Sequence, residues 1–155
     1  MKHIIVIGVG NPYRRDDGAG PAVIAGLRHR NLSNVELAEC DGEPTRLLDL
    51  WSGADLAVVV DAVRAAPAHP GTIHRRSLLH PSFGRAGSAT SHAVDLGEAV
   101  TLAAALDLLP ARMLLYAIEA GDISAGVGLS PEVSASVADL VTEIAGEVTW
   151  RAARR

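Results

Sequence analysis

The chain has 155 residues, of which 48% are hydrophobic and 21% charged, proportions that exclude a disordered chain and suit one domain over residues 1–155. The formal net charge is −4, which argues against a general nucleic-acid-binding protein, since such proteins present a basic face to phosphates. No apolar stretch approaches the roughly 20 residues that a membrane span requires, so we expect no membrane association.

The first 63 residues alternate between strand and helix patterns. Residues 3–8 form a continuous β-branched run, which is typical of a strand buried on both faces. Pro21 then begins a helix. Residues 35–39 alternate as a less buried strand, and residues 45–51 form a short helix. Residues 54–63 are again continuously apolar and predict a third strand.

The second part of the chain begins with a polar strand over residues 71–76, which we place at a sheet edge. Residues 78–91 lack periodicity and are rich in Gly and Ser, so we expect a long loop, a kind of segment that is often functional. A helix follows over residues 95–109, and residues 113–118 are the last buried strand. Ser130 occupies an N-cap position and starts the C-terminal helix.

Strands that alternate with helices predict an α/β fold. The expected architecture is a three-layer sandwich with a mostly parallel, five-stranded sheet between helices. In such a sheet, the loops that follow the strands emerge at one edge. If right-handed crossovers place the first and third strands side by side, Asp17 and Asp61 face one crevice there.

Asp17, Asp61 and His92 are the candidate site. We expect the loop that ends in His92 to fold over the two carboxylates, which would create an open divalent-metal site with a position left for water or substrate. Each residue alone also has a structural explanation, because an Asp at a strand end or a His before a helix can serve as a cap. The three together, with the motifs described below, favour the metal site.

Gly8-Val9-Gly10 after a buried strand suggests a dinucleotide-binding loop, but three features exclude it. Tyr13 stands where the third glycine of that motif belongs, and Pro12 removes a backbone donor that should face a pyrophosphate. Asp16 and Asp17 would place negative charge where phosphates must lie.

Cys40 is the only cysteine, so the chain cannot form an internal disulfide, which suits a reducing cytosol. It has no CxxC partner, and a half-buried structural role is favoured over a reactive thiol. The N-terminal apolar run has only five residues, too few for the core of a signal peptide. We therefore expect a soluble, cytoplasmic protein.

Six short runs, spread in order over nearly the whole chain, resemble those of hydrogenase maturation endopeptidases, which process the large subunit of nickel–iron hydrogenases. The runs are Gly8-Val9-Gly10-Asn11-Pro12, Asp16-Asp17-Gly18-Ala19-Gly20, Val60-Asp61-Ala62, Ser91-His92, Ile118-Glu119 and Gly128-Leu129-Ser130-Pro131-Glu132-Val133. The resemblance implies a phosphorylase/hydrolase-like sheet between helices. It also implies that Asp17, Asp61 and His92 are both metal ligands and catalytic residues, with Asp16 as the alternative ligand.

The resemblance further implies the reaction. Such a protein recognises nickel already installed in the large-subunit precursor and removes a short C-terminal extension by one peptide cleavage. Nickel is then supplied by the substrate, although zinc or cadmium could occupy the same ligands. The expected partner is the hydrogenase precursor, and the protein is expected to be a monomer. A non-proteolytic adaptor that binds nickel or docks the precursor stays open as the alternative.

Several other residues have a structural explanation beside a functional one. The second family motif usually reads Asp-Gly-Gly-Thr, whereas this chain has Asp41-Gly42-Glu43-Pro44-Thr45, so Asp41 either lines the cleft or only shapes a turn. Glu119 stands at a strand end and ranks below the three candidate residues. No chemistry is assigned to the remaining histidines, which are His3, His29, His69, His74 and His80.

Overall fold

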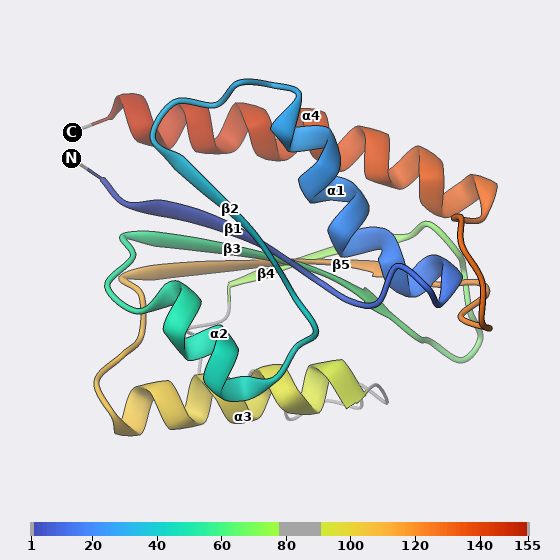
Figure 1. The fold of residues 1–155 in the computed structure, drawn as a ribbon, viewed down its shortest axis with the longest axis horizontal. Coiled ribbons are helices and arrows are strands. Elements are labelled where there is room, and N and C mark those ends of the chain that lie inside the picture. Colours follow the sequence, from blue (N-terminus) through green and yellow to red (C-terminus); the bar gives the residue numbers. More distant parts are fainter. Residues whose placement is uncertain (1, 78–90, 155) are drawn as a thin grey trace.

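In a computed structural model of the chain, residues 2–77 and 91–154 are described, with side chains described for 2–77 and 96–154. A five-stranded sheet has the order β2-β1-β3-β5-β4, and only β4 runs antiparallel to its neighbour (Figure 1). The predicted α/β architecture is therefore confirmed. The strands are β1 (Ile4–Val9), β2 (Val35–Cys40), β3 (Leu56–Val63), β4 (Ile73–Ser77) and β5 (Arg112–Glu119).

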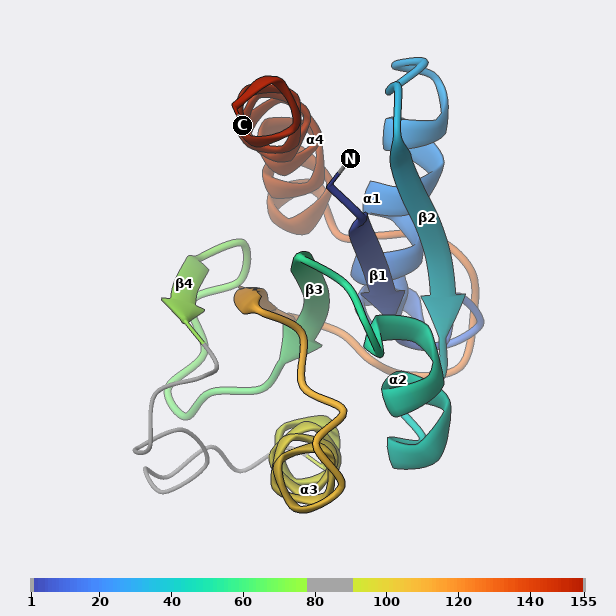
Figure 2. The same ribbon diagram turned by 90° about the vertical axis from the view of Figure 1, so that its left-hand side faces the viewer.

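Helices cover both faces of the sheet. Figure 2 shows α1 and α4 on one face and α2 and α3 on the other, which makes the predicted three layers. A short 3₁₀ helix, η1, leads directly from the β1 loop into α1. The helices are η1 (Arg15–Gly18), α1 (Ala19–Arg28), α2 (Pro44–Trp51), α3 (Ser91–Ala105) and α4 (Pro131–Ala153). No helix in the described part of the chain is long and apolar enough to cross a bilayer.

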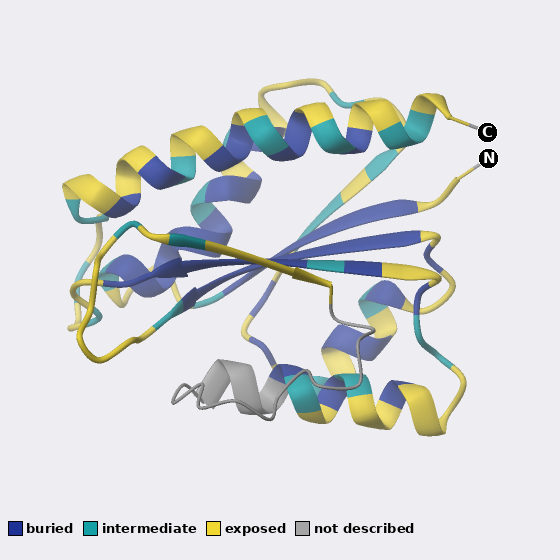
Figure 3. Cartoon of the chain, turned by 180° about the vertical axis from the view of Figure 1, so that it is seen from behind, coloured by how far each residue is buried: buried dark blue, intermediate teal, exposed yellow. Residues whose placement is uncertain are grey.

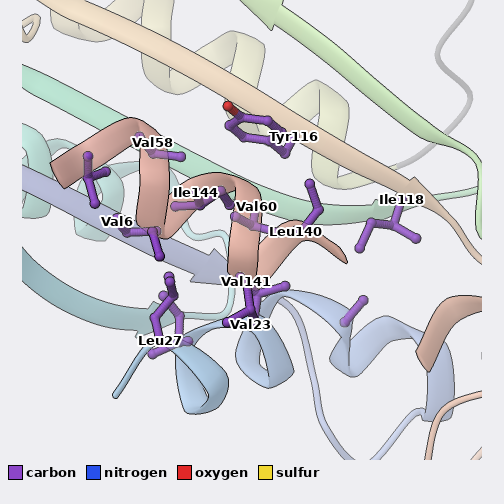
Figure 4. Packing of buried hydrophobic residues seen from close by; sticks show 14 of the residues in the cluster. Val6, Val23, Leu27, Val58, Val60, Tyr116, Ile118, Leu140, Val141 and Ile144 are labelled. Atoms are coloured by element: carbon purple, nitrogen blue, oxygen red, sulfur yellow. The ribbon is translucent and has the colours of Figure 1, made fainter. Parts of the chain in front are cut away.

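Small and branched apolar side chains fill both layers. Between the sheet and α1 and α4, Val6, Val58 and Val60 pack against residues of both helices, as Figure 4 shows. Trp51, the last residue of α2, is fully buried in the other layer, between the sheet and the helices α2 and α3. Because successive strand residues point to opposite faces, β3 and β5 supply alternate residues to the two layers. The continuous apolar runs therefore predict strands buried on both faces correctly.

Two glycines allow α1 to begin almost in contact with the sheet. A Cβ at Gly8 would lie 2.4 Å from the Gly20 carbonyl oxygen, and a Cβ at Gly20 would lie 2.4 Å from the Val9 oxygen and 2.6 Å from the Val60 oxygen. Any side chain at Gly20 would collide with backbone, which cannot move aside easily. The glycines around the β1 loop thus serve close packing of helix on strand.

The structure corrects the predicted limits of α3. The helix begins at Ser91, four residues before the predicted Asp95, and it ends at Ala105 instead of residue 109. Asp95 is therefore inside the helix and not at its cap. At the other end, Asp107 has a left-handed φ of +58° that breaks the helix, and Leu106 beside it is 55% exposed. Of the predicted 78–91 loop, residues 78–90 lie outside the described residues.

The polar strand is found at the sheet edge as predicted. β4 pairs with β5 alone, and most of its residues are exposed, as the view from behind shows (Figure 3). An edge strand accommodates polar side chains, because one side of it faces water. The reversal of β4 places its first residues beside the carboxyl end of β5, with Ile73 opposite Ile118.

Candidate active site

The predicted neighbours β1 and β3 lie side by side, with Gly8 opposite Val60. The loop after β1 leads into η1, which packs against β3 at the carboxyl edge of the parallel strands. Asp17 lies in η1 and Asp61 lies near the end of β3, so both come from elements that meet at this edge. Both residues are buried, with exposed fractions of 7% for Asp17 and 3% for Asp61.

The Asp17 carboxylate organises the loop that carries it. Its Oδ2 accepts a 2.9 Å hydrogen bond from the backbone N–H of Asn11, and the Asn11 side chain accepts in turn from the N–H of Tyr13. Gly10 has a φ of +141°, and a Cβ there would lie 1.9 Å from the Asp17 carbonyl oxygen. The Gly-Asn sequence is therefore required for the chain to turn tightly around Asp17.

Asp61 is held by its own strand. Its Oδ1 accepts a 2.8 Å hydrogen bond from the N–H of Ala62. Asp61 is two residues beyond Val59, which packs in the layer under α2 and α3, so its side chain lies on that face of the sheet. The face is the one that α3 covers.

The third candidate, His92, has a helical backbone. It lies in the first turn of α3 and not in a loop, which corrects the prediction, while its side chain lies outside the described residues. Among the side chains that are described, no three His, Cys, Asp or Glu residues gather as a metal-binding group. The assignment of Asp17, Asp61 and His92 as ligands therefore stays a prediction.

Asp16 has a structural role that the sequence did not reveal. Its carboxylate is fully buried and accepts hydrogen bonds from the N–H groups of Gly121, Asp122 and Ser130 at 2.7–2.9 Å, and from the Ser130 hydroxyl at 2.8 Å. Burial raises the pKa of Asp16, but these hydrogen bonds outweigh burial and leave the pKa below its usual value. Asp16 thus stays ionised as the anchor of the segment 121–130.

Backbone contacts strengthen the same connection. The N–H of Arg15 donates to the Gly126 carbonyl, and the N–H of Gly126 donates to the Tyr13 carbonyl. The Arg15 side chain also lies 3.7 Å from the carboxylate of Asp122. Ser130 is the N-cap of α4 as predicted, yet its hydroxyl bonds to Asp16 and does not cap the helix. The loop before α4 and the loop after β1 therefore form one unit.

Glu119 and His74 form a pair that sequence reasoning missed. The buried Glu119 carboxylate accepts a 3.0 Å hydrogen bond from the N–H of His69 and lies 2.8 Å from Nε2 of His74. The His69 hydrogen bond and, after it, the His74 ring hold the pKa of Glu119 below its usual value. The two residues are 45 positions apart, and only the pairing of β4 with β5 brings them together.

The second motif serves local structure. Asp41 accepts a hydrogen bond from the N–H of Glu43, which is the turn interpretation of that residue, and Glu43 caps α2 through the N–H groups of Thr45 and Arg46. The Cys40 thiol is buried, and burial raises its pKa. A raised pKa disfavours the thiolate, so the structural interpretation of Cys40 fits and the reactive one does not.

Comparisons with known proteins identify similar sequences and folds. A family model described as hydrogenase maturation protease matches residues 23–147. The hydrogenase expression/formation protein HupD of Thiocapsa roseopersicina is 32% identical over 134 residues, which are 84% of this chain. The aligned part is 60% of the HupD protein, so the chain spans less than two thirds of that relative.

Solved structures share the fold over almost the whole chain. The [NiFe] hydrogenase maturation protease HybD from Thermococcus kodakarensis superimposes with a TM-score of 0.78 at 27% identity, covering 96% of this chain and 99% of that one. The hydrogenase maturating endopeptidase HybD from E. coli gives a TM-score of 0.80 at 20% identity, covering 93% and 90% of the two chains. At that lower identity the likeness concerns the fold.

Proposed function

Because this chain belongs to the hydrogenase maturation protease family, we propose that it is an endopeptidase that removes a C-terminal extension from the large-subunit precursor of a nickel–iron hydrogenase. The observation that carries the proposal is the pair of buried carboxylates, Asp17 and Asp61, on adjoining elements at the carboxyl edge of the sheet. Ligands and catalytic groups are commonly found at this edge of an α/β sheet.

Nickel belongs to the substrate in this proposal. Asp17, Asp61 and His92 would bind the ion that the precursor already holds, with ligands of the precursor completing its coordination. Two carboxylates and one imidazole form a weak and poorly selective site, which suits an ion that arrives with its own ligands better than a resident cofactor. Nickel would thereby act as the recognition tag and the anchor that places the extension in the cleft. The reducing cytoplasm suits the lone Cys40 and is the proposed place of the reaction.

The decisive experiment incubates the purified chain with nickel-loaded precursor and measures the product mass. We expect one cleavage near the precursor C-terminus. Binding without cleavage would instead support the adaptor function.

A second arm uses nickel-free precursor and metal-stripped enzyme, with and without added zinc. We expect no cleavage in either condition, because the enzyme binds its substrate through the substrate's nickel. Efficient cleavage there would remove nickel recognition from the mechanism and favour an ordinary metallopeptidase.

A further inference from the structure

Peptide hydrolysis needs a group that takes a proton from the attacking water and returns it to the leaving amine. The three residues proposed to bind the substrate's nickel do not include a separate base. We propose that His74, held by Glu119, is this general base and later the general acid. The inference rests on the proposed endopeptidase function.

Sheet register places His74 beside the candidate site. Asp61 on β3 is opposite Ala117 on β5, and Ala117 is opposite His74 on β4. Residues paired in this way point to the same face, so Asp61 and His74 flank Ala117 on the face under α3. Neighbouring strands are about 4.8 Å apart, which puts the Cα atoms of Asp61 and His74 about 10 Å from each other. Ala117, which lies between them, is buried and contributes only a methyl side chain.

Glu119 fixes the proton on the His74 ring. Since the lowered pKa of Glu119 keeps its carboxylate ionised, the 2.8 Å contact requires Nε2 of His74 to carry the hydrogen. The neutral imidazole then has its lone pair on Nδ1. That nitrogen has no hydrogen-bond partner in the described part of the chain, so it is available to a water molecule. A carboxylate that orients a histidine base is the arrangement of the hydrolase triads.

A purely structural role does not account for the imidazole. The segment before β4 is already fastened to β5 by backbone hydrogen bonds from Gly71 to Glu119 and from Glu119 to Thr72. Ser136 of α4 also donates to the Gly71 carbonyl. The His74 side chain is 46% exposed while that of Glu119 is 6% exposed. The buried Glu119 carboxylate thus holds the His74 ring in a position that solvent can reach.

The steps balance as follows. Nδ1 of His74 takes one proton from water as the water oxygen bonds to the scissile carbonyl carbon, which gives a tetrahedral oxyanion. When the C–N bond breaks, the carbonyl re-forms and Nδ1 gives the same proton to the leaving nitrogen. The products are a carboxylic acid and an amine, and His74 returns to its neutral form.

The test compares His74→Ala and Glu119→Gln with the wild-type chain on nickel-loaded precursor. We measure the single-turnover cleavage rate and, separately, precursor affinity. His74→Ala should lower the rate 10²- to 10⁴-fold, the usual contribution of general acid–base catalysis, with affinity unchanged within about threefold. Added imidazole should restore part of the rate, because a soluble base can occupy the space of the lost ring.

Glu119→Gln tests the orientation of the ring. The glutamine oxygen can still accept the His69 N–H, so its amide would donate to Nε2 of His74 and force the proton onto Nδ1. We expect a rate loss like that of His74→Ala in a protein with unchanged circular dichroism. The control is His29→Ala, which removes an exposed imidazole at the end of α1, and it should cleave at the wild-type rate.

The outcomes separate the two proposals. If wild-type protein cleaves and His74→Ala cleaves equally fast, His74 is not the base and the endopeptidase function stands. A loss of affinity with an unchanged rate would also overturn the base role. If the wild-type chain itself does not cleave nickel-loaded precursor, both proposals are rejected. His74→Asn serves as the second variant if His74→Ala is unstable.

Discussion

Asp16 and Asp17 are neighbours in the chain, yet their carboxylates bond to different parts of the molecule. Asp16 accepts its hydrogen bonds from residues 121–130, whereas Asp17 accepts one from Asn11 within its own loop. Asp16 is fully buried and Asp17 is 7% exposed. The pair therefore divides into a structural residue and a candidate ligand, which favours Asp17 over Asp16 as the residue at the site.

Asp16→Ala should destabilise the protein by about 3 kcal/mol, since it leaves several buried N–H donors without an acceptor. Urea denaturation followed by circular dichroism measures the change. Asp122→Ala is the matched control: the Asp122 side chain is exposed, and its ion pair with Arg15 and its two hydrogen bonds from Ser124 lie at the surface, so this variant should lose at most about 1 kcal/mol. Equal losses in both variants would contradict the anchoring role of Asp16.

The same carboxylate should make stability depend on pH. The pKa of Asp16 is lowered in the folded protein, so the unfolded chain binds more protons in the acid range. The ionised Asp16 carboxylate stabilises the folded state in full above its ordinary pKa of about 3.9. This stabilisation is lost as the pH falls through the lower pKa that Asp16 has in the folded protein. Asp16→Asn should therefore flatten the fall in unfolding free energy as the pH drops below about 4. Wild-type and variant plots of unfolding free energy against pH that run parallel would refute this role of Asp16.

Asp17→Asn should weaken metal binding more than Asp16→Asn does, measured per folded molecule. An amide keeps the shape of the side chain but removes the charge that attracts a divalent cation. Titration with cadmium or zinc, with the folded fraction determined in parallel, would compare the two variants. A larger loss of metal affinity in Asp16→Asn would assign Asp16 as the ligand in place of Asp17.

His92→Ala should abolish precursor cleavage and leave the fold intact. The residue lies in the first turn of α3, and alanine is a strong helix former, so the helix should persist. Cleavage and thermal unfolding are measured on the same preparation. Full activity in the folded variant would remove His92 from the site.

Gly20→Ala should lower both stability and cleavage, because its Cβ would lie 2.4–2.6 Å from backbone oxygens of β1 and β3. Relief of such overlap typically costs about 1–3 kcal/mol, and it would push η1 away from the sheet edge. Gly146→Ala is the control, since a Cβ at this position in α4 meets nothing within 4 Å. It should stabilise the helix by up to about 1 kcal/mol.

The central strands β1, β3 and β5 were predictable because their apolar runs depend on local sequence alone. The site was only partly predictable: the ends of β1 and β3 placed Asp17 and Asp61 at one edge, and nothing local indicated the partners of Asp16, which lie more than 100 residues away. The start of α3 was missed because its first turn follows a Gly- and Ser-rich segment without hydrophobic periodicity. The His74–Glu119 pair depends on the register of an antiparallel edge strand, which the sequence pattern does not specify.

The hydrogen bond between Asp16 and Ser130 joins residues 114 positions apart in the sequence. This separation determines when the bond can form during synthesis. A ribosome-bound chain that ends before residue 121 contains Asp17 and Asp61 but none of the groups that hold the neighbouring Asp16. Contacts of such long range form late in folding. The loop around Asp17 should thus become rigid only once residues 121–130 have emerged, so the growing chain would not engage a metal-bearing precursor before that point.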